Sequence, residues 1–177
     1  MTTPVLETGE ILLRPPEVAD AQAIFTGWTS DPEATKFMRF STHQSLADTV
    51  EWLTAEEENR TGNRVYAWLF TQKATGEVFG SGGLYWQEDQ SMFELGFIIA
   101  KKYWNQGLTT RCAKAMISFA RSELAPAAIF ACHATANPAS GKVLEKLGFA
   151  YRQSGRYTSV DGTRTFESKE YILYPGN

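Results

Sequence analysis

The apolar residues of this chain form two kinds of pattern: short continuous or alternating runs, and longer runs with a helical period. The first kind, when it is bounded by glycine, proline and other turn residues, predicts strands. Seven segments show it: Ile11–Arg14, Val65–Thr71, Val78–Trp86, Ser91–Ile99, Ala127–Ala134, Tyr151–Thr158 and Thr165–Tyr174. The last two flank Asp161-Gly162, a dipeptide typical of tight hairpin turns, so we expect them to pair.

Helical spacing appears in four further segments. The apolar residues of Val18–Trp28 form one helical face, and Ser45 with Asp48 resembles a capping box that opens a second helix. A third helix is expected over Thr110–Ser122, and a fourth follows Asn137. The predicted order is strand, two helices, three strands, helix, strand, helix and two strands, which indicates a mixed α/β fold.

The segment Tyr103–Thr110, YWNQGLTT, joins a predicted strand to a predicted helix and has the features of an anion site. Gly107 lets the backbone approach a ligand closely. The first turn of the following helix offers unpaired N–H groups and the positive end of the helix dipole. This combination suits a pyrophosphate. An ordinary strand-to-helix turn with one glycine is the alternative.

A second segment, Ala134–Phe149, reads ATANPASGKVLEKLGF and marks a helix at both ends. Asn137 is the expected N-cap, Pro138 takes the first helical position, and Gly148 is the expected stop.

Together, YWNQGLTTRCAKAMISFA and NPASGKVLEKLGF resemble the two cofactor motifs of the GNAT superfamily of N-acetyltransferases, and within it the branch of the ribosomal-protein alanine N-acetyltransferases. The segments EILLRP, SDPEATKFM and ELGF extend the resemblance over most of the chain. It implies one mixed, mostly antiparallel central sheet of about seven strands, flanked by about four helices and splayed between the fourth and fifth strands. It also implies acetyl-CoA as the co-substrate.

The resemblance further implies a set of cofactor-binding residues. Exposed backbone of the fourth strand would pair with the amide-bearing arm of the cofactor at Phe97, Ile98 and Ile99. The pyrophosphate would lie over Asn105, Gln106, Gly107, Leu108, Thr109 and Thr110. Asn137 would contact the pantetheine arm while it caps its helix. Thr109 and Asn105 depart from the usual small residues of the family, but their contacts would be mostly backbone, so we expect binding to persist.

Two residues are implied as catalytic. Glu94 stands where related enzymes often carry an acid, and it is the candidate general base, directly or through a water; a solvent-facing strand residue is the alternative. Ser140 is the candidate that protonates the leaving thiolate, because the tyrosine used by many GNAT enzymes would fall at Leu144. A serine that only satisfies a helix backbone group is the alternative there, and Tyr151 and Tyr157 remain alternative acids.

Composition narrows the class of protein. The 177 residues, 43% of them hydrophobic, suit one domain over residues 1–177. A net charge of −3 provides no basic field for nucleic acid. The N-terminus lacks the features of a signal peptide, and no apolar run approaches the ~20 residues of a membrane span, so we expect a cytoplasmic protein. Two cysteines and two histidines without metal-ligand spacing predict no metal site.

The expected function is therefore direct, acetyl-CoA-dependent transfer of an acetyl group to a primary amine, either a protein N-terminus or a small amine. Two alternatives remain: a non-catalytic acyl-CoA-binding protein of the same fold, and an acyltransferase that uses a larger donor such as succinyl-CoA. The expected partners are acetyl-CoA and the amine, with neither nucleic acid nor membrane, in a monomer or a homodimer.

Overall fold

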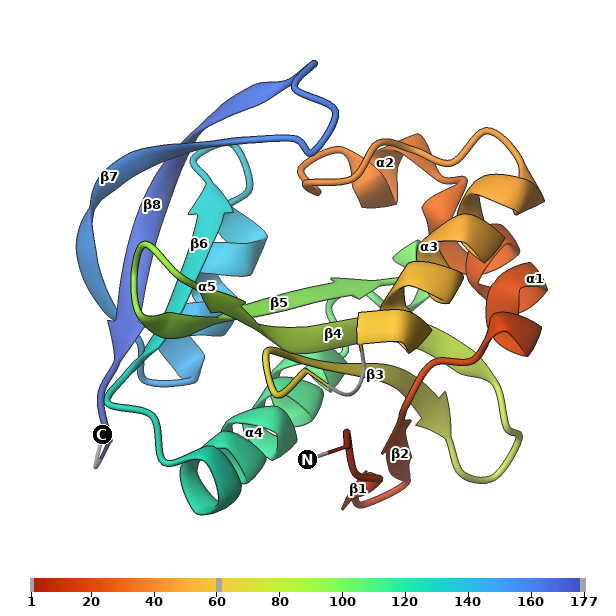
Figure 1. Ribbon diagram of the computed structural model, residues 1–177, viewed down its shortest axis with the longest axis horizontal. Coiled ribbons are helices and arrows are strands. Elements are labelled where there is room, and N and C mark those ends of the chain that lie inside the picture. Colours follow the sequence, from red (N-terminus) through yellow and green to blue (C-terminus); the bar gives the residue numbers. More distant parts are fainter. Residues whose placement is uncertain (1, 60–61, 176–177) are drawn as a thin grey trace.

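The computed structural model describes residues 2–59 and 62–175, and one eight-stranded sheet runs through it (Figure 1). The strands are β1 (Leu6–Thr8), β2 (Ile11–Arg14), β3 (Val65–Gln72), β4 (Val78–Gln87), β5 (Met92–Ile99), β6 (Ile129–Ala134), β7 (Ala150–Thr158) and β8 (Thr165–Leu173). They lie in the order β1-β2-β3-β4-β5-β6-β8-β7. Neighbouring strands are antiparallel except for β5 and β6, which are parallel.

Each of the seven predicted strands is present, and β1 adds an eighth at the sheet edge. β1 has three residues, too few to show a period in the sequence. It pairs with β2 across a tight turn in which Gly9 has a φ of 58°, a left-handed value that glycine adopts without strain. The extra strand lengthens the sheet without changing the predicted fold class.

The α-helices of the described residues are α1 (Ala21–Ile24), α2 (Pro32–Thr35), α3 (Leu46–Asn59), α4 (Leu108–Phe119) and α5 (Pro138–Lys146). The first predicted helix is divided, because a 3₁₀ segment precedes α1 and a π segment follows it. The short α2 was not predicted; Asp31 caps it by accepting a hydrogen bond from the Glu33 N–H at 2.8 Å. Among these helices none has the length and apolar character needed to cross a bilayer.

Two apolar cores lie on opposite faces of the sheet. One packs α4 and α5 against the sheet and includes the fully buried Trp68 and Met116. The other lies beneath α1 and α3 and includes the fully buried Trp28 and Leu53. Burial of such large apolar side chains stabilises each layer and gives the central strands a rigid setting.

β5 and β6 separate shortly after they meet. Their register pairs Phe93 with Ile129 and Glu94 with Phe130, after which β5 continues to Ile99 beside β4 alone. Figure 1 shows the two strands diverging, with β6 turning toward β8. These are the fourth and fifth of the predicted strands, so the expected splay between them is confirmed.

Candidate active site

The open edge of β5 presents backbone groups toward the gap between the strands. The Ala100 N–H donates to the Phe79 carbonyl at 2.8 Å, which fixes the phase of the β4–β5 ladder. In that phase, the N–H and C=O groups of Ile98 are hydrogen-bonded to β4. The N–H and C=O groups of Phe97 and Ile99 point away from β4. Two of the three strand residues in the predicted cofactor set thus offer backbone groups to the gap, and Ile98 could contact a ligand there only through its side chain.

Trp104 lies beside this edge. Its Nε1–H donates to the Ile99 carbonyl at 2.9 Å, and the side chain is 40% exposed. One acceptor of the edge is therefore already paired, which leaves the Phe97 peptide group and the Ile99 N–H toward the gap. The tryptophan also ties the end of β5 to the turn that precedes α4.

That turn has the geometry of an anion site. Asn105 and Gly107 have left-handed φ values of 61° and 74°, and α4 begins directly afterwards at Leu108. Gly107 is the N-cap, so no side chain caps the first-turn N–H groups, and a Cβ built at Gly107 would meet no atom within 4 Å. The helix starts earlier than the predicted Thr110. Unpaired helical N–H groups and open space therefore occur together.

Lys101, Lys102 and Gln106 are exposed, whereas Thr109 and Thr110 are half-buried. Gln106 donates from its Nε2 to the Lys102 carbonyl at 2.9 Å, which braces the turn. Lys101 and Lys102 pair with the carboxylates of Glu33 and Glu77. The negative charge of these two carboxylates therefore weakens any attraction between the lysines and a bound phosphate.

The second predicted motif forms α5 as expected at its N-terminus. The Asn137 side chain accepts from the Ser140 N–H at 3.4 Å, and Pro138 is the first helical residue. Asn137 and Ser140 are half-buried, whereas Leu144 is 1% exposed and belongs to the core. The capping role of Asn137 is thus confirmed, and Leu144 is unavailable as a ligand contact.

Glu94 is held in a polar cluster on the face of β5 opposite α4. Its side chain is 12% exposed and accepts from the Arg39 Nη2 at 3.0 and 3.3 Å. The Cys132 thiol donates to the same carboxylate at 3.3 Å, and Arg39 also approaches the Cys132 Sγ at 3.7 Å. No sequence pattern marks Arg39 or Cys132, since they lie 55 and 38 positions from Glu94.

An aromatic ring completes the cluster. The Arg39 guanidinium lies 4.9 Å from the centre of the Tyr157 ring, within cation–π range. The Tyr157 hydroxyl donates to the Phe37 carbonyl at 2.7 Å, so its proton is committed to that bond. Tyr151, the other alternative acid, is 56% exposed, and its hydroxyl pairs with the Ser154 hydroxyl.

The pKa values of four groups around Glu94 are shifted: those of Arg39, Cys132, Tyr157 and Tyr85. Burial acts to lower the pKa of Arg39, but the charge and hydrogen bond of Glu94 raise it, and the net shift is upward. Burial, followed by the Glu94 charge, raises the pKa of the Cys132 thiol to about 12. Burial also raises the pKa of Tyr157 to about 12, and that of Tyr85, the cross-strand partner of Glu94, is raised chiefly by burial. At neutral pH the cluster therefore contains one cation, a neutral thiol and neutral phenols.

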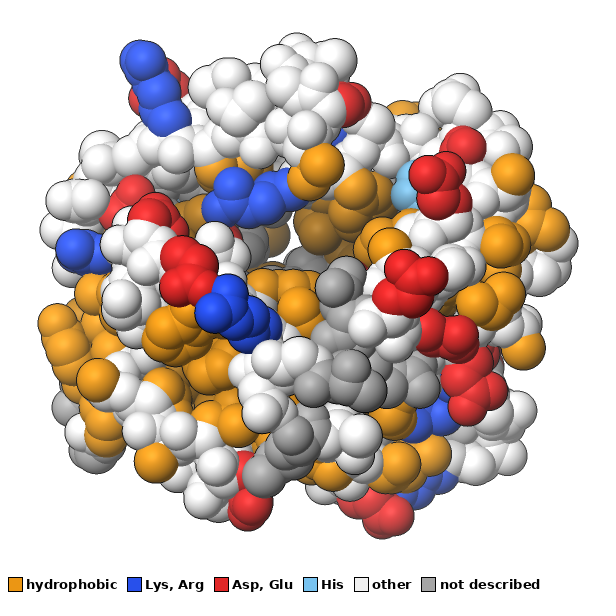
Figure 2. Space-filling model, viewed as in Figure 1, with side chains coloured by type: hydrophobic (Ala, Val, Ile, Leu, Met, Phe, Trp, Pro, Cys, Tyr) orange, Lys and Arg blue, Asp and Glu red, His pale blue; other side chains and the backbone are white. Residues whose placement is uncertain are grey.

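Several hydrogen bonds join residues 36–41 to residues 157–164, and we call this set of contacts the clasp. The clasp holds Arg39 above the sheet. The Arg164 guanidinium donates to three backbone carbonyls, at 3.2, 3.2 and 2.7 Å, those of Lys36, Met38 and Phe40. The Val160 N–H donates to the Arg39 carbonyl at 2.7 Å. The tip of the β7–β8 hairpin accordingly meets the segment after α2 (Figure 1), and the face is hollowed near its centre beneath them (Figure 2).

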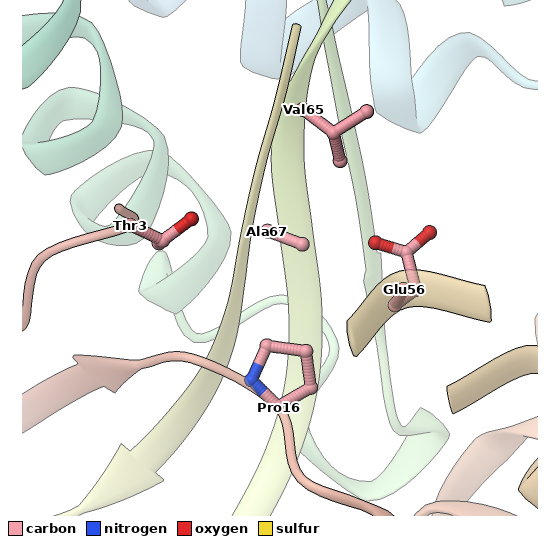
Figure 3. Close-up of a pocket in the computed structure, with 5 residues that line it drawn as sticks. All are labelled: Thr3, Pro16, Glu56, Val65 and Ala67. Carbon is pink, nitrogen blue, oxygen red and sulfur yellow. The ribbon is translucent and has the colours of Figure 1, made fainter. Parts of the chain in front are cut away.

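Two cavities lie elsewhere. One of about 10 Å³, lined by Thr3, Pro16, Glu56, Val65 and Ala67, is about the size needed for one water (Figure 3). A groove of about 700 Å³ runs between the β1 region and α4. Neither is lined by Glu94 or by the first turn of α4. Within residues 2–59 and 62–175, no three potential metal ligands of the His, Cys, Asp or Glu type lie together.

Residues 10–150 match the family described as the acetyltransferase (GNAT) domain. The chain belongs to the GNAT acetyltransferase family. It is 29% identical to YkkB of Bacillus subtilis over 85% of this chain and 88% of that protein. It is 26% identical to the uncharacterized N-acetyltransferase YoaA of the same organism over 82% of each chain.

Solved structures of GNAT acetyltransferases share this fold. A GNAT acetyltransferase from Bacillus anthracis has a TM-score of 0.81 at 19% identity, over 97% of this chain and 98% of that one. The ribosomal-protein-S5-alanine acetyltransferase from Vibrio fischeri has a TM-score of 0.80 at 15% identity, over 98% of each chain. The microcin C7 self-immunity acetyltransferase MccE, solved with acetyl-CoA and AMP, has a TM-score of 0.82 at 12% identity, over 94% of this chain and 93% of that one.

Proposed function

We propose that this GNAT protein is an N-acetyltransferase that transfers an acetyl group directly from acetyl-CoA to a primary amine. The proposal rests on one observation: the open edge of β5 is followed by the N-terminus of α4, where Gly107 is the N-cap and no side chain caps the helix. An extended amide-bearing arm can pair with such an edge, and a pyrophosphate can bind such a helix end.

The residues fit acetyl-CoA in three places. The pyrophosphate would take the N–H groups of the turn and of the first turn of α4, over Asn105, Gln106, Gly107, Leu108, Thr109 and Thr110. The amide arm would pair with the free backbone groups of Phe97 and Ile99. Asn137 and Ser140, half-buried at the start of α5, would flank the arm from the other side of the gap. When bound, acetyl-CoA supplies the acetyl group as an activated thioester.

Each protein group then has one task. The Phe97 N–H would donate to the carbonyl oxygen on which negative charge develops. Glu94 would take a proton from the attacking amine, directly or through a water, and is kept close to the gap by Arg39 and Cys132. The Ser140 hydroxyl would give a proton to the departing thiolate.

The proposal also covers the domain organisation, the location and the partners of the enzyme. Residues 1–177 would act as one domain in the cytoplasm, where the two free cysteines, Cys112 and Cys132, remain reduced. Acetyl-CoA and the amine would be its partners.

A thiol-release assay tests the function. Wild-type protein is incubated with acetyl-CoA and a panel of amines and peptides. The amount of released CoA is measured, and the product is identified by its mass. We expect release that depends on the amine and forms an N-acetylated product. Tight acetyl-CoA binding without turnover on any amine would instead favour the non-catalytic acyl-CoA-binding alternative. Faster turnover with succinyl-CoA would favour the alternative with a larger acyl donor.

A further inference from the structure

The Arg39 guanidinium uses only part of its hydrogen-bonding capacity. Its Nη2 alone contacts Glu94 and Cys132, so among the described residues its Nη1 and Nε groups have no hydrogen-bond partner. Arg14 offers a contrast within the same chain, because its Nη1 and Nη2 both donate to Asp20, at 2.9 and 2.6 Å. Arg39 therefore keeps donors on two edges of its guanidinium, and each can give a charge-assisted hydrogen bond to a carboxylate oxygen.

These donors are both held in place and accessible. The Val160 N–H fixes the Arg39 backbone carbonyl, and the Tyr157 ring supports the guanidinium at 4.9 Å. Tyr157 is in turn fixed by its bond to the Phe37 carbonyl. The Arg39 side chain is nevertheless 43% exposed. A fixed cation with open donors is prepared to bind an anion without first losing much conformational freedom.

The charges around Glu94 favour an acceptor that carries a carboxylate beside its amine. An ammonium group that approaches Glu94 also approaches Arg39, and two cations would then share one carboxylate. An acceptor that carries its own carboxylate beside the amine relieves this repulsion, since its amine can face Glu94 while its carboxylate faces the open donors of Arg39.

We propose that Arg39 determines acceptor specificity by binding a carboxylate of the amine substrate, which is a small α-amino acid or a similar zwitterionic amine. This inference rests on the proposed function of the same site. A small acceptor is part of this proposal because the clasp joins residues 36–41 to residues 157–164 across the face that holds Glu94. The acyl donor could also carry a carboxylate, but Arg39 lies beside Glu94, the residue proposed to take a proton from the amine.

Equilibrium binding tests the inference without turnover. Isothermal titration calorimetry compares common α-amino acids with their matching primary amides, which keep the amine and lose the anionic group. We expect at least one acid to bind wild-type protein roughly 10- to 100-fold more tightly than its amide, the range for hydrogen bonds between charged groups. Arg39→Met should abolish that difference, and Arg39→Lys should retain part of it. Arg156→Met, which removes an exposed arginine paired with Glu167 at 2.7 Å, is the matched control and should leave it unchanged.

Turnover separates a specificity role from damage to Glu94. In Arg39→Met, both substrates lose the contact that positions Glu94, but only the acid also loses a partner for its carboxylate, so kcat/KM should fall roughly 10- to 100-fold more for acids than for amides. Equal binding of acid and amide by wild-type protein, or equal losses on both in the variant, would overturn the inference. So would a loss confined to succinyl-CoA as donor, because the carboxylate would then belong to the acyl group. An Arg39-dependent acid preference in calorimetry, with no amine acetylated, would support the anion site and contradict the proposed function.

Discussion

Glu94 is the residue on which the proposed chemistry depends most directly. Substituting Glu94→Gln removes the base while leaving an oxygen that can still accept from Arg39, so the fold should be preserved. Turnover should fall roughly 100- to 10,000-fold near neutral pH, the usual range for general acid–base catalysis. The defect should shrink as pH approaches the pKa of the free amine, about 8 for the α-amine of a peptide and about 10 for a lysine-like amine, because neutral amine then forms without a base.

A pH–rate profile of wild-type protein and Glu94→Gln measures this effect. A loss that is constant with pH would assign Glu94 to substrate positioning instead. Unchanged turnover at every pH would remove it from the mechanism.

Ser140 should contribute less than Glu94. A free thiol has a pKa of about 8.5, so its thiolate already leaves readily, and a hydroxyl can add only modest help. Ser140→Ala should therefore lower kcat near the lower end of the 100- to 10,000-fold range while acetyl-CoA affinity changes little. Single-turnover kinetics with calorimetry separate the two quantities. A large loss of affinity would mean that the hydroxyl binds the cofactor arm, and unaltered chemistry would exclude it as the acid.

The turn between β5 and α4 can be tested as an element, because the chain contains a close match for its glycine. Gly107 and Gly76 have φ values of 74° and 73°, and neither would place a Cβ within 4 Å of another atom. Gly107→Trp and Gly76→Trp should thus impose a similar strain, about 1–2 kcal/mol for a left-handed residue. Only Gly107→Trp should lose acetyl-CoA affinity, since its indole would occupy the proposed phosphate site.

Calorimetry measures the affinity, and thermal unfolding confirms that both variants are folded. If Gly107→Trp titrates acetyl-CoA like the Gly76 variant, the loop does not hold the phosphates.

Over the whole molecule, the clasp joins two distant parts of the chain and positions Arg39. Tyr157→Phe removes the hydroxyl that donates to the Phe37 carbonyl and should lower the free energy of unfolding by about 1–2 kcal/mol. It should also raise the KM of the amine, because the ring that supports Arg39 would lose the hydrogen bond that fixes its position. Tyr151→Phe is the control: this hydroxyl is exposed and pairs with Ser154, so the change should stay within about 0.5 kcal/mol.

Urea unfolding and steady-state kinetics measure both variants. Equal destabilisation by the two substitutions would contradict the proposed role of the clasp. A fall in kcat of about 100-fold in Tyr157→Phe, with stability unchanged, would make Tyr157 rather than Ser140 the proton donor.

Local signals in the sequence determined most of the elements. Apolar periods marked seven of the eight strands, and the Asn137-Pro138 pair marked the start of α5. Such signals are readable because a period and a cap depend on residues within a few positions of one another. Gly107 marked the turn before α4 for the same reason, although the first turn of that helix began two residues before the predicted start. The sequence did not predict the three-residue strand β1, because a segment of that length is too short to show a period.

Only the tertiary structure decided what surrounds Glu94. Arg39 and Cys132 reach it from 55 and 38 positions away, and Arg164 closes the clasp on carbonyls more than 120 positions away. The phase of the β4–β5 ladder likewise decided that Phe97 and Ile99, and not Ile98, offer backbone groups to the gap. These features depend on strand order, register and the path of the chain between elements. No local period encodes them, so the sequence alone predicted a general base without its cationic neighbour.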